Sequence, residues 1–369
     1  MHQHNGRHGA KSLSLLACAI FATTLLGCGS PSPAPKEKTT APAEEPKPAL
    51  QCTFEAPTTT TEWRAGEKLP VRFRLEGNVP IDSCLLWWGD RRLGKVTRGD
   101  TLLRPDGLPV GVQYLRVVAH AGQSAQEWSR RVTLFPPKPA RYTYRRIASY
   151  PHDPKAYTQG LLYLEGALYE STGQRGHSSL RKVELASGKV LQCTPLPDQL
   201  FGEGLALRQG MLYQLTWTAG KCLVYSLASL QQVDQLSYPG QGWGLESDGD
   251  FLYRTDGSEW LYLVEPDHFT TTRSLQVFTD QGPQPMLNEL EFIDGLLYAN
   301  VYMEDRIVAI DPNTGAVVRD IDMAHLLQAP DRTPEAEVLN GIAYDKQHGA
   351  IYLTGKYWPR LFQVQFVAK

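Results

Sequence analysis

Residues 201–217 read FGEGLALRQGMLYQLTW, and this stretch decides the fold because its pattern returns along the chain. The pattern has two parts: a small or polar pair before an aliphatic residue, here Glu203-Gly204-Leu205, and an apolar–Tyr pair after a turn, here Leu212-Tyr213. The first part occurs five times, as QGL at 159–161, EGL at 203–205, WGL at 243–245, NEL at 288–290 and NGI at 340–342. The second part follows each time, as LY at 168–169, 212–213, 252–253 and 297–298 and as IY at 351–352. The C-terminal part of the chain is therefore built from repeats of one unit.

The spacing of the repeats indicates the fold class. The aliphatic residues that close the first part are 40 to 52 residues apart. Repeats of this length, with short strands and Gly/Asp turns, are typical of the blades of a β-propeller. The last repeat lacks an outer strand, and residues 142–149 read as a strand with no repeat of their own. We therefore predict an all-β propeller in which the 142–149 strand completes the last blade and removes two sheet edges.

The register of the repeats predicts which residues meet in space. A tight turn joins the two strands of each repeat, so the start of the first strand and the end of the second lie on one face. In a propeller the first strand is innermost, and its start lies at the rim of the central channel. The first-strand starts are Gln159, Glu203, Trp243, Asn288 and Asn340, and the second-strand ends are Gly173, Trp217, Gly257, Tyr302 and Lys356. This face gathers one carboxylate, one lysine, three amides and three large aromatic side chains.

The composition of this rim predicts a small-molecule site. Aromatic walls with a few convergent polar groups are the usual form of such a site. A single acid among aromatic rings should have a raised pKa, an effect that Lys356 opposes, and this makes Glu203 a candidate proton shuttle. Polar residues at blade starts can instead bond backbone groups inside the channel. We prefer that structural role for Asn288 and Asn340 taken singly, leave Gln159 open, and prefer a functional role for Glu203 with the two tryptophans.

The N-terminus reads as the export signal of a lipoprotein. Residues 1–27 carry two basic residues and an apolar stretch that is too short to span a membrane. The stretch ends in LLGC, which looks like a bacterial lipobox and predicts lipidation of Cys28. Residues 28–50 are rich in Pro, Ala, Lys and Glu and predict an extended tether. The alternative is an ordinary secretory signal cut nearby. We expect an exported, lipid-anchored protein of the bacterial cell envelope, in the outer membrane and periplasm if the host is Gram-negative.

Residues 51–137 predict a separate domain of short strands. Residues 69–75 and 113–119 alternate apolar and polar side chains, and Gly, Asn and Asp turns separate such runs. This pattern predicts a β-sandwich of immunoglobulin-like size, and it contains no catalytic constellation. The string PPKP at 136–139 marks the boundary, so the propeller domain is predicted to span 138–369.

Four cysteines lie outside the predicted signal and lipid site, namely Cys52, Cys84, Cys193 and Cys222. An even number in an exported protein predicts disulfides. Three connectivities are open, and the domain boundary favours Cys52–Cys84 and Cys193–Cys222; buried free thiols are the alternative. No CxxC, HExxH or His/Cys spacing predicts a metal site. The net charge of −2 gives no reason to expect nucleic acid as a partner.

Nine strings of the C-terminal part carry a resemblance to a known family. They are YPHD at 150–153, YTQGL at 157–161, FGEGL at 201–205, LTW at 215–217, GWGL at 242–245, TDGS at 255–258, LNELE at 287–291, LNGIAYD at 339–345 and LTGK at 353–356. In this order and spacing, over about residues 145–369, the chain resembles the plant and bacterial type of glutaminyl cyclase, also called glutamine cyclotransferase. The resemblance implies a five-bladed propeller that converts N-terminal glutamine of peptides into pyroglutamate and releases ammonia, with no catalytic metal or cofactor. It does not cover the predicted sandwich.

The resemblance also implies roles for individual residues. Glu203 matches the general acid/base, which takes a proton from the substrate α-amine and returns it to the departing nitrogen. Asn288 and Lys356 match the residues that polarise the γ-carboxamide and hold charge on its oxygen. The substrate-binding set that it implies is Gln159, Tyr157, Trp217, Trp243, Tyr302 and Asn340. Tyr157 and Tyr302 stand where the family commonly has Phe and Trp, so both keep an aromatic wall but change its polarity.

These observations lead to a functional prediction with two alternatives. We predict a metal-independent glutaminyl-peptide cyclotransferase, an acyltransferase that acts as a monomer on peptides and proteins with N-terminal Gln and contacts the membrane through its lipid anchor. One alternative is a non-catalytic envelope propeller that binds peptide N-termini or another small ligand. The other is a propeller hydrolase for lactones or sugars, which would need a channel cluster of Asp, Asn and Glu that is only partly present. Glu203 together with Lys356 favours chemistry over binding alone.

Overall fold

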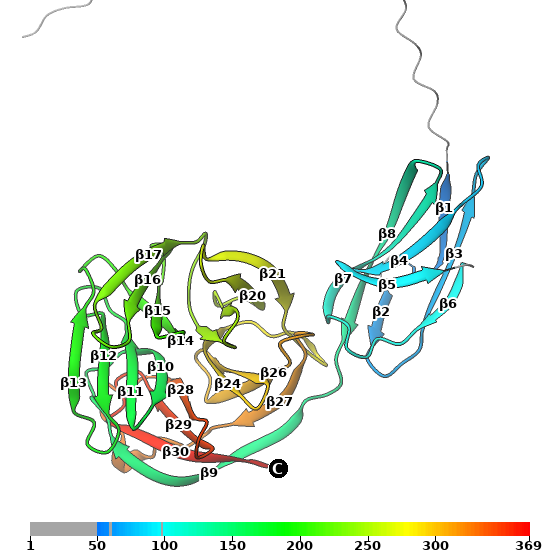
Figure 1. Cartoon of the computed structure of the whole chain (residues 1–369). Helices are drawn as coiled ribbons and strands as arrows, with labels where there is room; N and C mark the ends of the chain where they lie inside the picture. Colours follow the sequence, from blue (N-terminus) through cyan, green and yellow to red (C-terminus); the bar gives the residue numbers. More distant parts are fainter. Residues whose placement is uncertain (1–49, 59–60, 97–98) are drawn as a thin grey trace, which may run out of the picture. The chain divides into compact units, whose positions relative to one another are not determined.

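The computed structural model describes residues 50–58, 61–96 and 99–369, and these residues form an all-β structure (Figure 1). Within this part of the chain the only helical turn is a short 3-10 helix at Ala329–Asp331. No helix of these residues is long and apolar enough to cross a membrane. The predicted signal peptide 1–27, the lipidation site Cys28 and almost all of the predicted tether lie outside the described residues.

The first three repeats each form one four-stranded antiparallel sheet in which neighbours in sequence are neighbours in space. The first sheet consists of β10 (Thr158–Leu164), β11 (Ala167–Thr172), β12 (Ser179–Glu184) and β13 (Val190–Pro195). The second consists of β14 (Gly202–Arg208), β15 (Met211–Thr216), β16 (Lys221–Ser226) and β17 (Gln232–Ser237). The third consists of β18 (Leu245–Ser247), β19 (Leu252–Arg254), β20 (Trp260–Glu265) and β21 (Thr270–Gln276). Each predicted pair of strands is therefore present.

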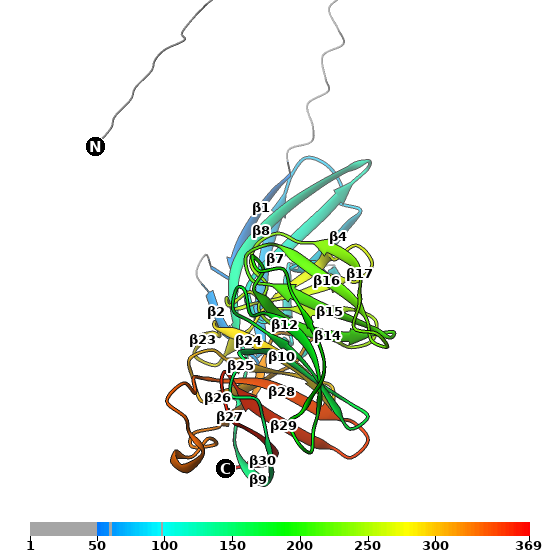
Figure 2. The same cartoon turned by 90° about the vertical axis from the view of Figure 1, so that its left-hand side faces the viewer.

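The last two repeats share an eight-stranded sheet because one strand from the start of this region joins them. In sheet order the strands are β24 (Leu287–Ile293), β25 (Leu296–Val301), β26 (Arg306–Ile310), β27 (Val317–Asp322), β9 (Ala140–Pro151), β30 (Arg360–Ala368), β29 (Ala350–Gly355) and β28 (Leu339–Asp345). β9 pairs antiparallel with β30 along most of its length, and the two run side by side in both views (Figure 1, Figure 2). The prediction that residues 142–149 complete the last repeat is confirmed. A short ribbon, β22 (Phe278–Thr279) with β23 (Gly282–Pro283), precedes β24.

The first strands of the five repeats form a closed ring, in which β10 contacts β14, β14 contacts β18, β18 contacts β24, β24 contacts β28, and β28 contacts β10. The repeated glycine makes this possible. A Cβ atom on Gly160 would lie 2.5 Å from Leu205 N, and one on Gly204 would lie 2.6 Å from Trp243 O, closer than real Cβ contacts occur. The glycine of the motif is therefore the place where one first strand touches the backbone of the next.

The N-terminal strands form two sheets around a shared core. One sheet has the order β1 (Gln51–Ala56), β3 (Leu69–Glu76), β6 (Asp100–Leu103), and the other has the order β2 (Thr61–Arg64), β8 (Ser124–Phe135), β7 (Gly111–Ala121), β4 (Ser83–Trp88), β5 (Arg91–Val96). Trp88 is completely buried, stacks on Trp63 at a ring separation of 6.0 Å, and donates its indole N–H to Pro109 O at 2.9 Å. Trp88 therefore belongs to the core of this domain.

The four cysteines correct one prediction, because all of them are free thiols in the structure. Cys193 is exposed on β13, whereas Cys222 is buried inside the next sheet on β16, so their side chains face different environments. Cys52 and Cys84 lie on β1 and β4 of opposite N-terminal sheets, and burial raises the pKa of each thiol to about 11. Such thiols stay protonated and are poor nucleophiles. The predicted Cys52–Cys84 and Cys193–Cys222 bonds are absent.

Candidate active site

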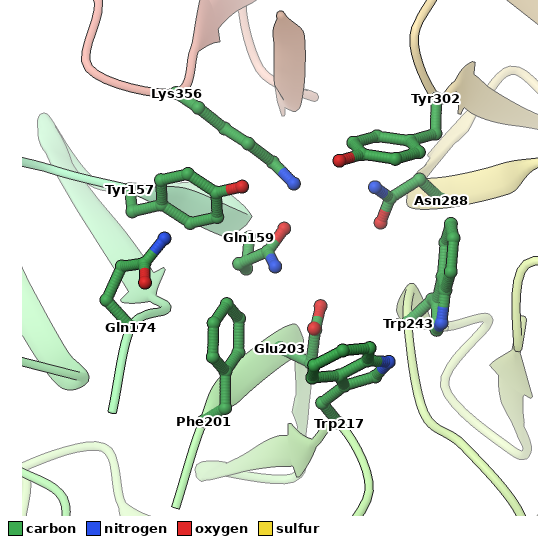
Figure 3. A pocket seen from close by; sticks show the side chains of 10 residues that line it. All are labelled: Tyr157, Gln159, Gln174, Phe201, Glu203, Trp217, Trp243, Asn288, Tyr302 and Lys356. Atoms are coloured by element: carbon green, nitrogen blue, oxygen red, sulfur yellow. The ribbon is translucent and has the colours of Figure 1, made fainter. Parts of the chain in front are cut away.

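A cavity of about 200 Å³ opens where the first strands begin (Figure 3). Its lining residues are Tyr157, Gln159, Gln174, Phe201, Glu203, Trp217, Trp243, Asn288, Tyr302 and Lys356. Eight of these ten side chains are the predicted catalytic and substrate-binding residues, and they come from all five repeats. The structure therefore brings seven residues that the register places at the rim, together with Tyr157, around one cavity.

In four of the five repeats the residue at the first-strand start lies in a β-bulge, and Trp243, which precedes β18, is the exception. The pairing register shifts between Thr158 and Gly160, which brackets Gln159, and between Gly202 and Leu205, which brackets Glu203. Equivalent shifts occur at the start of β24, around Asn288, and at the start of β28. A bulge bends its strand and redirects a side chain, and bulges are common beside active sites. At Gln159, Glu203 and Asn288 the local backbone thus turns a polar side chain out of the sheet and toward the cavity.

Glu203 presents an unpartnered carboxyl group to the cavity. The residue is only 4% exposed, and no side chain or backbone group of the described residues donates a hydrogen bond to its carboxylate. Burial raises the pKa of Glu203 well above its ordinary value, and the positive charge of Lys356 opposes this only in part. The Glu203 backbone is fixed from below, since its carbonyl accepts the hydroxyl of Ser171, which in turn accepts Gln214 Nε2 at 2.7 Å. The carboxyl group is therefore attached to a fixed backbone, and its burial favours the protonated form more than in an exposed glutamate.

Lys356 is buried between two aromatic rings. Its Nζ lies 4.7 Å from the ring centroid of Tyr157 and 4.7 Å from that of Tyr302. The faces of such rings attract a cation. Burial nevertheless lowers the pKa of Lys356 to about 8, while the negative charges of Glu203 and Glu337 act in the opposite direction. No ion pair with this ammonium is present among the described residues, and Lys356 lines the cavity, where it can meet a negative charge that develops there.

Two amides complete the polar part of the cavity. Asn288 directs its side chain into the cavity (Figure 3), and its buried Oδ1 has no hydrogen-bond partner among the described residues. Gln159 Oε1 accepts Asn340 Nδ2 at 3.3 Å, and the same Nδ2 donates to Thr158 O at 2.9 Å. Asn340 is completely buried and does not line the cavity. It lies behind Gln159 and orients that amide, so the structure places it one step away from direct contact with a ligand.

The aromatic side chains form continuous walls by edge-to-face contacts. Phe201 lies 6.0 Å from Tyr157 and 5.7 Å from Trp217, while Trp243 lies 5.4 Å from Tyr302. Glycines at two second-strand ends make room for these rings. A Cβ atom on Gly173 would lie 2.7 Å from Phe201 Cζ, and one on Gly257 would lie 2.6 Å from Trp243 Cζ2. At the two predicted rim positions that are glycine, the aromatic rings of other residues therefore pack directly against the backbone.

Sequence reasoning missed two lining residues, Phe201 and Gln174. Phe201 lies two residues before Glu203, and strand alternation places residues i and i+2 on the same side, so that spacing could have found it. Gln174 follows β11 in a turn with a positive φ of 83°, and its carbonyl accepts His177 N and Ser178 Oγ at 2.9 Å each. No periodic pattern in the sequence indicates the direction of such a side chain.

Comparison with known proteins indicates the family of the chain. A family model described as glutamine cyclotransferase matches residues 115–366, beginning within β7 and thus earlier than the motif strings do. The glutaminyl-peptide cyclotransferase of Arabidopsis thaliana is 38% identical over 223 residues, which are 59% of this chain and 70% of that protein. The crystal structure of Myxococcus xanthus glutaminyl cyclase superimposes with a TM-score of 0.59 at 40% identity, covering 63% of this chain and all of that one. Among the described residues no three His, Cys, Asp or Glu side chains are grouped as a metal site. The chain belongs to the glutamine cyclotransferase family.

Proposed function

We propose that the chain is a glutaminyl-peptide cyclotransferase, which converts an N-terminal glutamine into pyroglutamate and releases ammonia. One observation carries the proposal: a single buried carboxyl group, Glu203, shares a small aromatic cavity with the ammonium of Lys356 and the amide of Asn288. The cavity of about 200 Å³ is smaller than a site for a drug-sized ligand and suits one amino-acid residue. The family membership and the names of the two relatives support the same activity.

The reaction requires one bond to form and one to break. The α-amino nitrogen attacks the carbonyl carbon of the γ-carboxamide, and the amine proton passes to the Glu203 carboxylate. The tetrahedral intermediate then collapses, Glu203 returns the proton to the amide nitrogen, and the C–N bond breaks to release ammonia. At that stage both nitrogens are bonded to the same carbon of the five-membered ring, so one carboxyl group can reach both. No external acid, base or oxidant is needed for the balance.

The raised pKa of Glu203 fits this shuttle. The α-amino group of a peptide has a pKa of about 7.7–8.0. An ordinary glutamate would be far too weak a base to take a proton from it, whereas burial moves the pKa of Glu203 upward toward that of the amine. This upward shift reduces the difference in pKa between Glu203 and the amine, which favours a group that acts first as base and then as acid.

The opposite wall of the cavity stabilises the negative charge. Lys356 and Asn288 project into the cavity from the last and the fourth repeat (Figure 3) and would hold the oxygen that becomes negative in the intermediate. Gln159, kept in place by Asn340, would orient the substrate, and Tyr157 with Tyr302 would keep the lysine in position. The tryptophan walls would enclose the aliphatic part of the glutamine and keep water out.

Finer features of the architecture and location are part of the proposal. The closed ring of first strands supports a five-bladed propeller, in which β28, β29, β30 and β9 make the last blade, over residues 138–369. The two N-terminal sheets support an immunoglobulin-like sandwich over residues 51–137. The LLGC string supports a lipoprotein with Cys28 as anchor, held in the cell envelope by the 28–50 tether.

A single assay separates this proposal from its alternatives. The purified protein is incubated with a Gln-initiated dipeptide, and both free ammonia and the mass of the peptide are followed. We expect one molecule of free ammonia for each peptide whose mass has fallen by the mass of one ammonia. The rate of this reaction should be the same with and without a chelator. Binding of the dipeptide without ammonia would favour the non-catalytic envelope propeller. Activity that a chelator abolishes and zinc restores would contradict the mechanism described above.

A further inference from the structure

One exposed side chain outside the cavity contacts both tryptophan walls. Gln241 lies in the loop between β17 and β18, and its Oε1 accepts the indole N–H of Trp217 at 2.8 Å and that of Trp243 at 3.0 Å. The two indoles come from consecutive repeats, since Trp217 follows β15 and Trp243 precedes β18. Both line the cavity, whereas Gln241 does not. A single oxygen atom thus connects two walls of the site.

The chemistry of these groups makes the arrangement a clamp. An indole has one N–H donor and no acceptor, and an amide oxygen has two lone pairs, so one oxygen satisfies two indoles fully. The outer torsion of a tryptophan side chain is broad, and without a fixed acceptor each ring could swing. Hydrogen bonds from both rings to one point couple their orientations, so the gap between them is set by the position of one atom.

The loop that carries this oxygen is itself anchored. The carbonyl of Gln241 accepts Arg254 Nη1, and the guanidinium of Arg254 lies 5.1 Å from the ring centroid of Tyr238 and 4.3 Å from that of Tyr262. Arg254 is buried on β19. The next residue in the loop, Gly242, donates its N–H to the carbonyl of Trp217 at 3.0 Å. The clamp therefore has a rigid base although its side chain faces solvent.

We propose that Gln241 is a positioning residue that sets the orientation of both tryptophan walls and thereby the affinity for the glutamine side chain of the substrate. This inference rests on the proposed function. The walls contact the part of the substrate that does not react, so they stabilise the bound substrate and the transition state equally. Loss of the correct wall orientation should therefore act mainly on KM. From the net free energy that a neutral hydrogen bond contributes, we expect kcat/KM to fall about tenfold when the acceptor is removed.

The variants separate the acceptor from the bulk of the side chain. Gln241→Met keeps length and removes the oxygen, Gln241→Asn keeps an amide but withdraws it by one methylene, and Gln241→Glu keeps the acceptor. Gln235→Met, at an exposed position on β17, is the matched control. Each protein is measured for kcat and KM on a Gln-initiated dipeptide. The indole N–H resonances are recorded by NMR and assigned with Trp217→Phe and Trp243→Phe.

Expected results distinguish a clamp from a bystander. In the Met and Asn variants both indole resonances shift together and KM rises so that kcat/KM falls about tenfold, while the Glu variant stays within about threefold of wild type. Unshifted resonances, or a kcat/KM in the Met or Asn variant equal to that of Gln235→Met, would overturn the proposal. If the wild type forms no pyroglutamate, the proposed function fails, and the resonances alone then decide whether Gln241 holds the two rings.

Discussion

Replacing Glu203 with Gln is the most direct test of the mechanism. The substitution keeps the shape of the side chain and removes its ability to exchange a proton. Of the residues that the structure describes, Glu203 is the only acidic one that lines the cavity, so none of them offers a second carboxyl group there to take over. Since general acid–base catalysis contributes about 10²–10⁴-fold per group, and both proton transfers depend on this group, kcat should fall by at least about 10²-fold. KM should change less, because the walls and amides remain.

The same variant should reveal the cost of burying the carboxyl group. The pKa of Glu203 in the folded protein lies above the ordinary value of 4.5, so the folded state holds this proton more tightly than the unfolded state does. The stability that this provides is fully present below pH 4.5 and is lost as the pH rises through the folded-state pKa. Glutamine does not titrate. The melting temperature of Glu203→Gln minus that of wild type should therefore increase as the pH is raised from about 4.5.

Steady-state kinetics on a Gln-initiated dipeptide and thermal melts between acid and neutral pH measure both effects. Glu67→Gln, an exposed position outside the cavity, is the control and should match wild type in kcat and in the pH dependence of melting. A folded Glu203→Gln protein with near-normal kcat would show that the proton shuttle lies elsewhere. A melting difference that does not change with pH would refute the inference that the carboxyl group is buried with a raised pKa.

Four further outcomes follow from the structure. Because the pKa of Lys356 is lowered to about 8, its ammonium group loses a proton above that pH, and kcat/KM should decline on the alkaline side near pH 8. Lys356→Arg should move this decline to higher pH, which a pH–rate profile measures. Gly257→Ala would place a Cβ atom 2.6 Å from Trp243 Cζ2 at a residue with a φ of +84°, so KM should rise and the free energy of unfolding should drop by about 1–3 kcal/mol, measured by kinetics and denaturant titration. Prolonged EDTA treatment should leave turnover of a Gln peptide nearly unchanged; loss that zinc restores would contradict the metal-free mechanism. Cys28→Ala should move the protein from the detergent phase to the aqueous phase in a partitioning experiment, whereas equal partitioning of both proteins would argue against the lipid anchor.

Much of the site could be predicted because the repeat sets a register. Once Glu203 and Trp243 are recognised as equivalent positions, the closed ring brings them to one rim without further information. The role of Asn340 could not be separated from that of Asn288 in this way, since both occupy the same position of the repeat. The difference depends on local geometry. Asn340 Nδ2 finds Thr158 O and Gln159 Oε1 within reach, and Asn340 does not line the cavity, whereas the Asn288 side chain does.

Features that depend on irregular backbone were not predictable. The bulge that brackets Glu203 redirects its side chain, yet FGEGL shows nothing more than a strand start. Gln174 faces the cavity from a turn with positive φ. The cysteine pairing failed for another reason: counting cysteines per domain ignores which sheet and which face each occupies, and Cys193 and Cys222 differ in both. Periodic patterns report on regular strands, and the exceptions lie where strands are interrupted.

Glu289 shows why a raised pKa alone does not mark the catalytic group. It stands where the other four repeats have glycine, and burial raises its pKa well above the ordinary value, as it does for Glu203. Its oxygens, however, accept the backbone N–H groups of Leu161 at 3.1 Å and Ile342 at 2.8 Å, on β10 and β28. Bulges free such donors, and this carboxyl group satisfies them at the centre of the ring.

Asn288 and Glu289 are thus adjacent residues with opposite tasks. The first turns outward to the cavity and keeps an unpartnered oxygen, and the second turns inward and joins three first strands by hydrogen bonds. Both residues lie within one bulge, between Leu287 and Leu290. In the second repeat the outward position is Glu203, which carries the acid, and the inward position is Gly204. The position of a carboxyl group within the bulge, and not its pKa, therefore decides whether it can act on a substrate or serves to close the ring.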